Sequence, residues 1–154
     1  VPAGIDDGQA FAVRGKGNEG LNGGPPGDCI VHVNVQEDPI FERDGYDIWM
    51  DVPLTYAQLV LGGEIVVPTI DGKVSYKVPE STQPGTTVRL RQKGVQYVNG
   101  GGRGDQYLRI QVEIPRGLTA KQKTTLEEFD QTLSDKNYEK RKSFFARIKD
   151  KFNK

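Results

Sequence analysis

Residues 102–112 read GRGDQYLRIQV, and residues 25–35 read PPGDCIVHVNV. Both stretches place a Gly-Asp pair before a segment in which apolar and polar residues alternate, as in a β-strand with one buried face. The correspondence extends further, because residues 1–35 align without a gap on residues 78–112 at an offset of 77. The matches are Val1-Pro2 with Val78-Pro79, Gly8 with Gly85, Arg14 with Arg91, Lys16-Gly17 with Lys93-Gly94, Gly27-Asp28 with Gly104-Asp105, and Val35 with Val112. Because glycine and aspartate recur where turns need them, the sequence predicts two related β-units.

The offset also predicts how much of each unit is present. The second unit spans residues 36–112, whereas only the last 35 residues of the first unit are found in the chain. Roughly 40 residues equivalent to 36–77 are therefore expected before Val1. We expect the chain to be a piece of a longer protein.

Turn residues and apolar alternation predict a chain made mainly of strands. Asp71-Gly72 fits a type I′ hairpin turn, and Thr55 fits the N-cap of a short helix that ends at Gly62. Strands are expected at residues 10–15, 29–35, 47–54, 64–70, 73–79, 87–92 and 106–114.

The C-terminal part is predicted to be helical. Thr119, with glutamine three residues later, fits a capping box that starts a helix at about residues 120–133. On this helix Leu126, Phe129 and Leu133 recur at the spacing of an amphipathic face. A polar break at residues 134–142 follows, and then an apolar stripe among lysines, made of Phe144, Phe145, Ile148 and Phe152.

These elements predict a mainly β fold class: two tandem related β-sandwich-like domains, the first only partly present, followed by a C-terminal helical segment. The expected boundaries are 1–36 for the last half of the first domain, 37–115 for the second domain, and 116–154 for the helical segment and basic tail.

Charge and composition exclude several classes of protein. The formal net charge is zero, so no overall field favours nucleic acid or membrane, and no apolar run approaches the about 18 residues of a membrane span. Residues 134–154 form a basic tail with eight Lys/Arg against three Asp/Glu, which leaves a weak membrane or nucleic-acid contact open. The single Cys29 and the lack of a signal peptide fit a reducing, cytoplasmic setting. Cys29 and the single His32 cannot complete a zinc site.

The sequence shows no catalytic constellation, which predicts a protein that is not an enzyme. His32 lies on the polar face of its strand, where a surface role is expected, and has no acid or nucleophile partner. The glycine-rich loops at 17–27 and 100–104 lead into strands and do not match a phosphate-binding loop. Both loops are therefore expected to be hairpin connections.

Several stretches resemble the C-terminal region of bacterial DnaJ co-chaperones of the zinc-containing class. They are VPAGIDDGQ, GKGNEGLNGGPPGD, PIFERDGYDI, LGGEIVVPTIDGKV, RLRQKGV, GGRGDQYLRIQVEIP, GLTAKQK and KSFFARIKDKF, and they cover essentially the whole chain in order. Two residues depart from the family pattern: Lys16, where glutamate is more common, and Gln92, where glycine or lysine is more common.

The resemblance implies a protein that captures unfolded polypeptides, delivers them to the DnaK chaperone and stimulates its ATPase. Such proteins carry a J-domain with a His-Pro-Asp motif, a zinc module inserted in the first β-domain, and a dimerising C-terminal segment. This chain contains neither His-Pro-Asp nor Cys-x-x-Cys. It is therefore expected to start after the zinc module, to hold no cofactor of its own and not to stimulate the ATPase.

Client binding in this family combines strand addition with a hydrophobic pocket, and the resemblance assigns Val31 to that pocket. Cys29, Val33 and Val35 share the face of Val31. A plain sandwich core is the alternative reading for all four residues. The exposed candidates of the second domain, Trp49 among them, are not assigned.

The resemblance also implies that the C-terminal segment forms a homodimer, for which Leu126, Phe129 and Leu133 are the candidate contacts. The alternative is that this face packs against its own domain. The stripe at 144–152 has several open roles: the dimer contact, a membrane surface, or a frayed end.

Two other classes of protein remain as alternatives. Arg103-Gly104-Asp105 could serve an extracellular adhesion module, and Trp49 with the tyrosines could stack on sugars in a carbohydrate-binding β-sandwich. The repeat favours a different role for the triplet, because Gly104-Asp105 recurs as Gly27-Asp28 while Arg103 matches Pro26. We therefore expect Asp105 to hold loop N–H groups at a turn into a strand.

Overall fold

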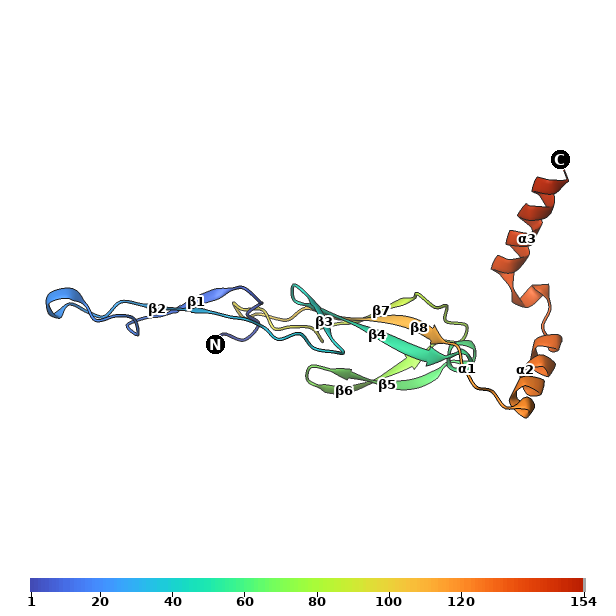
Figure 1. Cartoon of the computed structure of the whole chain (residues 1–154), viewed down its shortest axis with the longest axis horizontal. Coiled ribbons are helices and arrows are strands. Elements are labelled where there is room, and N and C mark those ends of the chain that lie inside the picture. The colour runs from blue at the N-terminus through green and yellow to red at the C-terminus, as the bar shows by residue number, and fades with distance from the viewer. Residues whose placement is uncertain (154) are drawn as a thin grey trace. The chain divides into compact units, whose positions relative to one another are not determined.

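The computed structural model describes residues 1–153 and divides into two compact units, Val1–Ile114 and the segment that starts at Pro115 (Figure 1). Lys154, the last residue of the predicted helical segment, lies outside the described residues. The strands are β1 Ala10–Val13, β2 Cys29–His32, β3 Glu42–Asp44, β4 Asp47–Thr55, β5 Gly63–Thr69, β6 Gly72–Val78, β7 Thr87–Leu90 and β8 Gln106–Glu113. The helices are α1 Tyr56–Leu61, α2 Ala120–Thr132 and α3 Glu139–Phe152, with short 3₁₀ turns at Leu21–Gly23 and Asp135–Asn137. This content confirms the predicted mainly β fold with a helical C-terminal segment.

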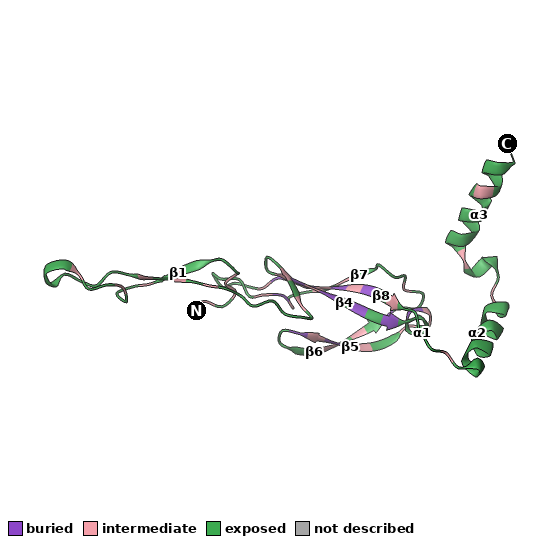
Figure 2. Ribbon diagram, viewed as in Figure 1, coloured by how far each residue is buried: buried purple, intermediate pink, exposed green. Residues whose placement is uncertain are grey.

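The core belongs to the second half of the first compact unit. A four-stranded sheet in the order β3-β4-β8-β7 faces the β5–β6 hairpin, and only the β4–β8 pair is parallel. Between them lies a buried cluster with members from both layers and from α1 (Figure 2). Its members are Met50, Val52, Leu54, Leu59, Val67, Val78, Leu108 and Ile110. Alternation along β4 and β8 puts the five members from these two strands on one face of the sheet, which explains why the apolar pattern could be recognised in the sequence.

A buried glutamine links the two layers. Gln106 lies on the same face of β8 as Leu108, and its Nε2 donates to the carbonyl oxygen of Pro68 on β5 at 2.9 Å. This hydrogen bond partly offsets the cost of burying the amide.

The structure confirms the 77-residue repeat, because corresponding residues make the same strand pairs and the same loop hydrogen bonds. In β1–β2, Ala10 faces His32, and in β7–β8 the residues at the same offset, Thr87 and Arg109, face each other. The loop hydrogen bonds repeat as well. The bond from Gly8 N–H to Val33 O corresponds to that from Gly85 N–H to Ile110 O. Likewise, Gly17 N–H to Gly27 O corresponds to Gly94 N–H to Gly104 O, and Gly27 N–H to Asn18 O corresponds to Gly104 N–H to Val95 O. All six distances lie between 2.7 and 2.9 Å.

The two copies differ in what covers them. In the second copy, β8 pairs with β4 along eight positions, from Ile48 with Gln106 to Thr55 with Glu113. In the first copy, β2 pairs with β1 only, and none of residues 1–35 is buried.

Three details of the predicted elements are wrong. Strand β3 was missed because its three residues, Glu42–Asp44, are polar and show no alternation. The β5–β6 hairpin forms, but its loop is Ile70-Asp71, and positive φ occurs only at Gly72 in this turn, so the turn is not type I′. Helix α3 begins at Glu139, inside the stretch predicted as a polar break.

Candidate functional site

The predicted pocket residue, Val31, lies on the apolar face of β2. It pairs with Phe11 of β1 and is half-buried, as Cys29 is on the same face. At the same position of the second copy stands Leu108, which is 0% exposed. The repeat therefore places Val31 on the face that carries the core in the second copy, where the β5–β6 hairpin opposes β8.

The same face includes the other three residues named with Val31. Their counterparts at the 77-residue offset are Gln106, Ile110 and Val112, of which the first two are buried. In the first copy Val33 is half-buried and Val35 is exposed. The structure thus places Cys29 and Val31 on one face of β2, whereas Val33 and Val35 follow the end of that strand.

The Arg-Gly-Asp triplet is held inside its own domain. Arg103 forms an ion pair with Asp71, and its Nε donates to the Gly94 carbonyl oxygen at 3.1 Å. Asp105 accepts from the Gln92 N–H at 2.8 Å and pairs with Arg89 at 2.6 Å. The hydrogen bond from Gln92, assisted by Arg89, lowers the pKa of the Asp105 carboxyl below its usual value. Both charged residues of the triplet already have partners within the chain, so the adhesion alternative is not supported.

The aspartate of the first copy plays the same part. Asp28 Oδ1 accepts from the Gly15 N–H at 3.0 Å, and Gly15 lies 77 residues before Gln92. Gly15 and Gln92 also share positive φ, at 68° and 57°. The prediction that the Gly-Asp pair ties down a turn is confirmed in both copies.

Trp49 lies on the outer face of the four-stranded sheet. Its ring stacks on Tyr107 with centroids 4.5 Å apart, and the Arg109 guanidinium lies 5.5 Å from the Trp49 ring centre. Arg109 also binds Glu42 and Asp51, both at 2.7 Å. Tyr107 and Arg109 already contact the Trp49 ring, so the structure gives no support to sugar stacking on Trp49.

The candidate dimerisation residues lie in the second compact unit. A capping box starts α2, in which Thr119 Oγ1 accepts from the Gln122 N–H at 3.2 Å. Leu126 and Phe129 are 49% and 42% exposed on this helix, and α2 has no buried residue. Leu133 is half-buried but caps α2 in an extended conformation, so the predicted face of three helical residues includes only two.

Helix α3 carries a second exposed apolar face. Phe144 and Phe152 are exposed and Ile148 between them is half-buried, at a spacing of four residues. Phe145 is exposed as well, and the Arg141 guanidinium lies 5.2 Å from its ring centre.

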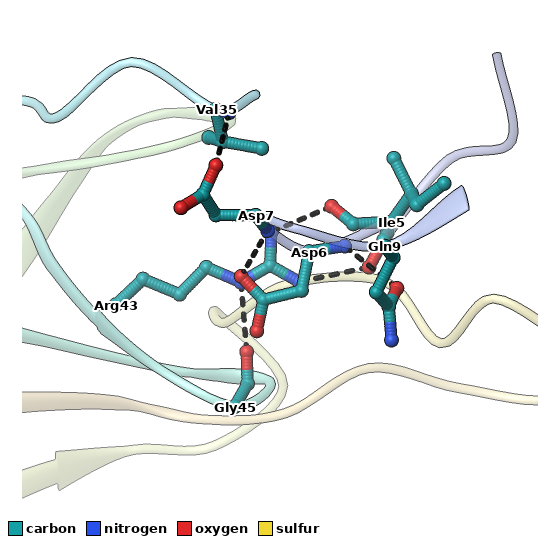
Figure 3. Close-up of polar contacts among 8 residues, drawn as sticks. Ile5, Asp6, Asp7, Gln9, Val35, Arg43 and Gly45 are labelled. Atoms are coloured by element: carbon teal, nitrogen blue, oxygen red, sulfur yellow. Dashed lines mark hydrogen bonds and ion pairs between the residues drawn. The ribbon is translucent and has the colours of Figure 1, made fainter. Parts of the chain in front are cut away.

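Arg43 was not predicted, yet it joins the two copies of the repeat (Figure 3). Its guanidinium donates to the carbonyl oxygens of Gly4 at 2.8 Å, Ile5 at 2.9 Å and Gly45 at 2.8 Å, and lies 3.4 Å from the Asp6 carboxylate. Gly4 packs closely on the second copy, since a Cβ there would lie 1.8 Å from the Gln96 carbonyl oxygen. No local sequence signal points to the contacts of Arg43 with Gly4 and Ile5, because these join residues 39 and 38 positions apart.

Among residues 1–153, no three His, Cys, Asp or Glu side chains are grouped so that they could hold a metal ion. Within the same residues, no helix is both long and apolar enough to cross a membrane.

Two related β-units in series, followed by a separate helical segment with exposed apolar faces, define a mainly β protein built on an internal repeat. The family model described as DnaJ C terminal domain matches residues 1–115, and the one described as Chaperone protein DnaJ C-terminal region matches residues 121–154. The chain therefore belongs to the DnaJ C-terminal domain family, which confirms the resemblance.

Curated relatives span the whole chain. "Chaperone protein DnaJ" of Ruminiclostridium cellulolyticum is 49% identical over 152 residues, which are 99% of this chain and 40% of the relative. The protein of the same name from Clostridioides difficile is 49% identical over 154 residues, covering 100% of this chain and 40% of the relative. That from Bacillus licheniformis is 50% identical over 152 residues, covering 99% and 40%. The chain thus spans about two fifths of the length of these relatives.

Proposed function

We propose that this chain is the client-binding and dimerising part of a DnaJ-type co-chaperone, which binds unfolded polypeptides for delivery to DnaK by the full-length protein. The observation that carries the proposal is the match of residues 1–115 to the DnaJ C-terminal domain family, with Val31 at a half-buried apolar position of β2. The proposed role is binding without catalysis, in the cytoplasm, with zinc held only by an upstream module.

The proposed roles of the three parts of the chain follow from the repeat. Residues 1–36 belong to a first client-binding domain, 37–115 to a second β-domain, and 116–154 to the dimerisation segment. Val31 is the proposed client contact because the resemblance to DnaJ proteins assigns it to the pocket, and its side chain is half-buried on β2. An unfolded chain offers apolar side chains and backbone hydrogen-bonding groups, and a pocket at a sheet edge binds both.

Substitution of Val31 tests the pocket in the complete protein. We expect Val31→Asp to weaken the binding of a fluorescein-labelled apolar peptide about tenfold or more, because a carboxylate would have to be desolvated in the pocket. Fluorescence anisotropy measures the affinity.

Ile30→Asp is the matched control, since Ile30 is the neighbouring residue on the exposed face of the same strand. Thermal unfolding of both variants separates lost binding from lost folding. An apolar-peptide affinity that is the same for Val31→Asp and wild type would remove Val31 from the proposed site.

A further inference from the structure

A cleft of about 660 Å³ lies where the two copies of the repeat meet, within the compact unit 1–114. Its walls come from the loop of the first copy at residues 6–7, from the connecting segment 35–43, and from β4. Val31 does not line this cleft. The cleft is therefore separate from the proposed client pocket on β2.

Part of the cleft lining is apolar and open to solvent. Ile40, Ile70 and Val35 are 54%, 43% and 40% exposed, and the half-buried rings of Phe41 and Trp49 lie among them. These residues come from separate stretches of the chain, so the fold gathers the apolar surface at this point. Exposed apolar side chains gathered in a cleft are typical of an interaction site.

The rest of the lining is strongly acidic. Six carboxylates line the cleft against two guanidinium groups, those of Arg43 and Arg109, so the lining carries a net charge of minus four. The carboxylates are Asp6, Asp7, Glu37, Asp38, Glu42 and Asp51. The formal net charge of the whole chain is zero, so this charge is a local feature of the cleft.

Both arginines are already committed to contacts inside the protein. Arg43 binds Gly4, Ile5 and Asp6, and Arg109 binds Glu42 and Asp51. The remaining acids, Asp7, Glu37 and Asp38, form no ion pair within residues 1–153. Asp7 and Asp38 accept only backbone N–H groups, and Glu37 makes no hydrogen bond or ion pair within residues 1–153. A cleft lined by one sign of charge attracts ligands of the opposite sign.

We propose that this cleft binds a cationic apolar segment of an extended polypeptide, one in which lysine or arginine alternates with aliphatic residues. The aliphatic side chains would pack on Ile40, Ile70 and Val35, and the cations would pair with Glu37 and its acidic neighbours. The inference rests on the proposed binding of unfolded polypeptides and adds a second site with its own charge preference. Because Val35 follows Val31 by four residues, one long client can contact both sites, which raises its avidity.

Matched peptides test the charge preference on the 154-residue chain. We expect a fluorescein-labelled peptide of alternating lysine and leucine to bind at least about tenfold more tightly than the same peptide with glutamate for lysine. The preference should shrink as salt is raised, since the cleft is open to solvent. Fluorescence anisotropy at low and high salt measures both effects.

Substitutions test whether the peptide binds in the cleft. Glu37→Lys and Ile40→Ser should each weaken binding of the lysine–leucine peptide about fivefold, the first by charge and the second by lost apolar contact. Glu80→Lys and Val66→Ser are the controls, because both residues are exposed and neither lines the cleft. Ile70→Ser offers a second apolar variant should Ile40→Ser lower the thermal stability.

The outcomes separate the two proposals. Equal binding of the two peptides, or a loss with Glu37→Lys no larger than with Glu80→Lys, overturns the cleft inference and leaves the proposed polypeptide binding in place. If neither these peptides nor an uncharged leucine-rich peptide binds, both proposals are wrong. Weaker binding in the cleft variants alone supports the inference.

Discussion

Truncation after Pro115 is expected to convert a dimer into a folded monomer. The intact chain has a mass of 17.1 kDa and should sediment at twice that mass, because α2 and α3 expose apolar faces that two copies can bury against each other. Residues 1–115 keep the whole buried core and should therefore stay folded. Sedimentation velocity measures the mass, and thermal unfolding checks the fold.

A point variant makes the same test without removing the segment. In a two-fold interface each patch is used twice, so Phe129→Asp removes two apolar contacts and should raise the dimer dissociation constant about a hundredfold or more. Glu127→Gln on the same helix is the control, since it changes a polar exposed residue. A monomeric intact chain, or a truncated chain that still forms dimers, would contradict the proposal that this segment joins the two copies.

The repeat could be predicted from the sequence because its turns have local chemical requirements. Asp28 and Asp105 each bind a loop N–H, and glycines recur where the chain turns, so the same letters return at the same offset. Strands β4 and β8 could be predicted as well, because one face of each strand is buried and their residues therefore alternate. Strand β3 lacked such a pattern, although the Asp44-Gly45 pair at its end is a hairpin signal.

The junction could not be predicted, because its contacts are long-range. Arg43 binds the carbonyl oxygens of Gly4 and Ile5, which any residue type provides, and no spacing rule links a side chain to a backbone so far away. The cleft beside Arg43 is likewise lined by residues from separate stretches of the chain. The assignment of Val31 came only from resemblance, since its own residue type fits a core as well as a pocket.

The Gly104 turn provides the sharpest test of how closely the second copy is packed. A Cβ at Gly104 would lie 2.1 Å from the Tyr46 carbonyl oxygen, well inside contact distance. The backbone cannot move away at low cost, because that oxygen accepts from the Val95 N–H at 2.7 Å and Gly104 itself bonds Gly94 and Val95 at 2.9 Å. Gly104→Ala should therefore lower the free energy of unfolding by about 2–4 kcal/mol.

Gly27 is the matched control, because it holds the same position in the first copy and makes the equivalent backbone bonds. The nearest atom to a Cβ at Gly27 is the Asn18 carbonyl oxygen at 3.9 Å, an ordinary contact, and its φ is not positive. Gly27→Ala should change the free energy of unfolding by less than about 1 kcal/mol, because the smaller entropy of the unfolded chain is the main effect. Urea unfolding of both variants measures the difference. Equal losses of unfolding free energy would mean that the turn requires glycine for a reason shared by both copies. A loss confined to Gly104→Ala would show that the requirement comes from the contact with Tyr46, a residue with no counterpart at the 77-residue offset in residues 1–35.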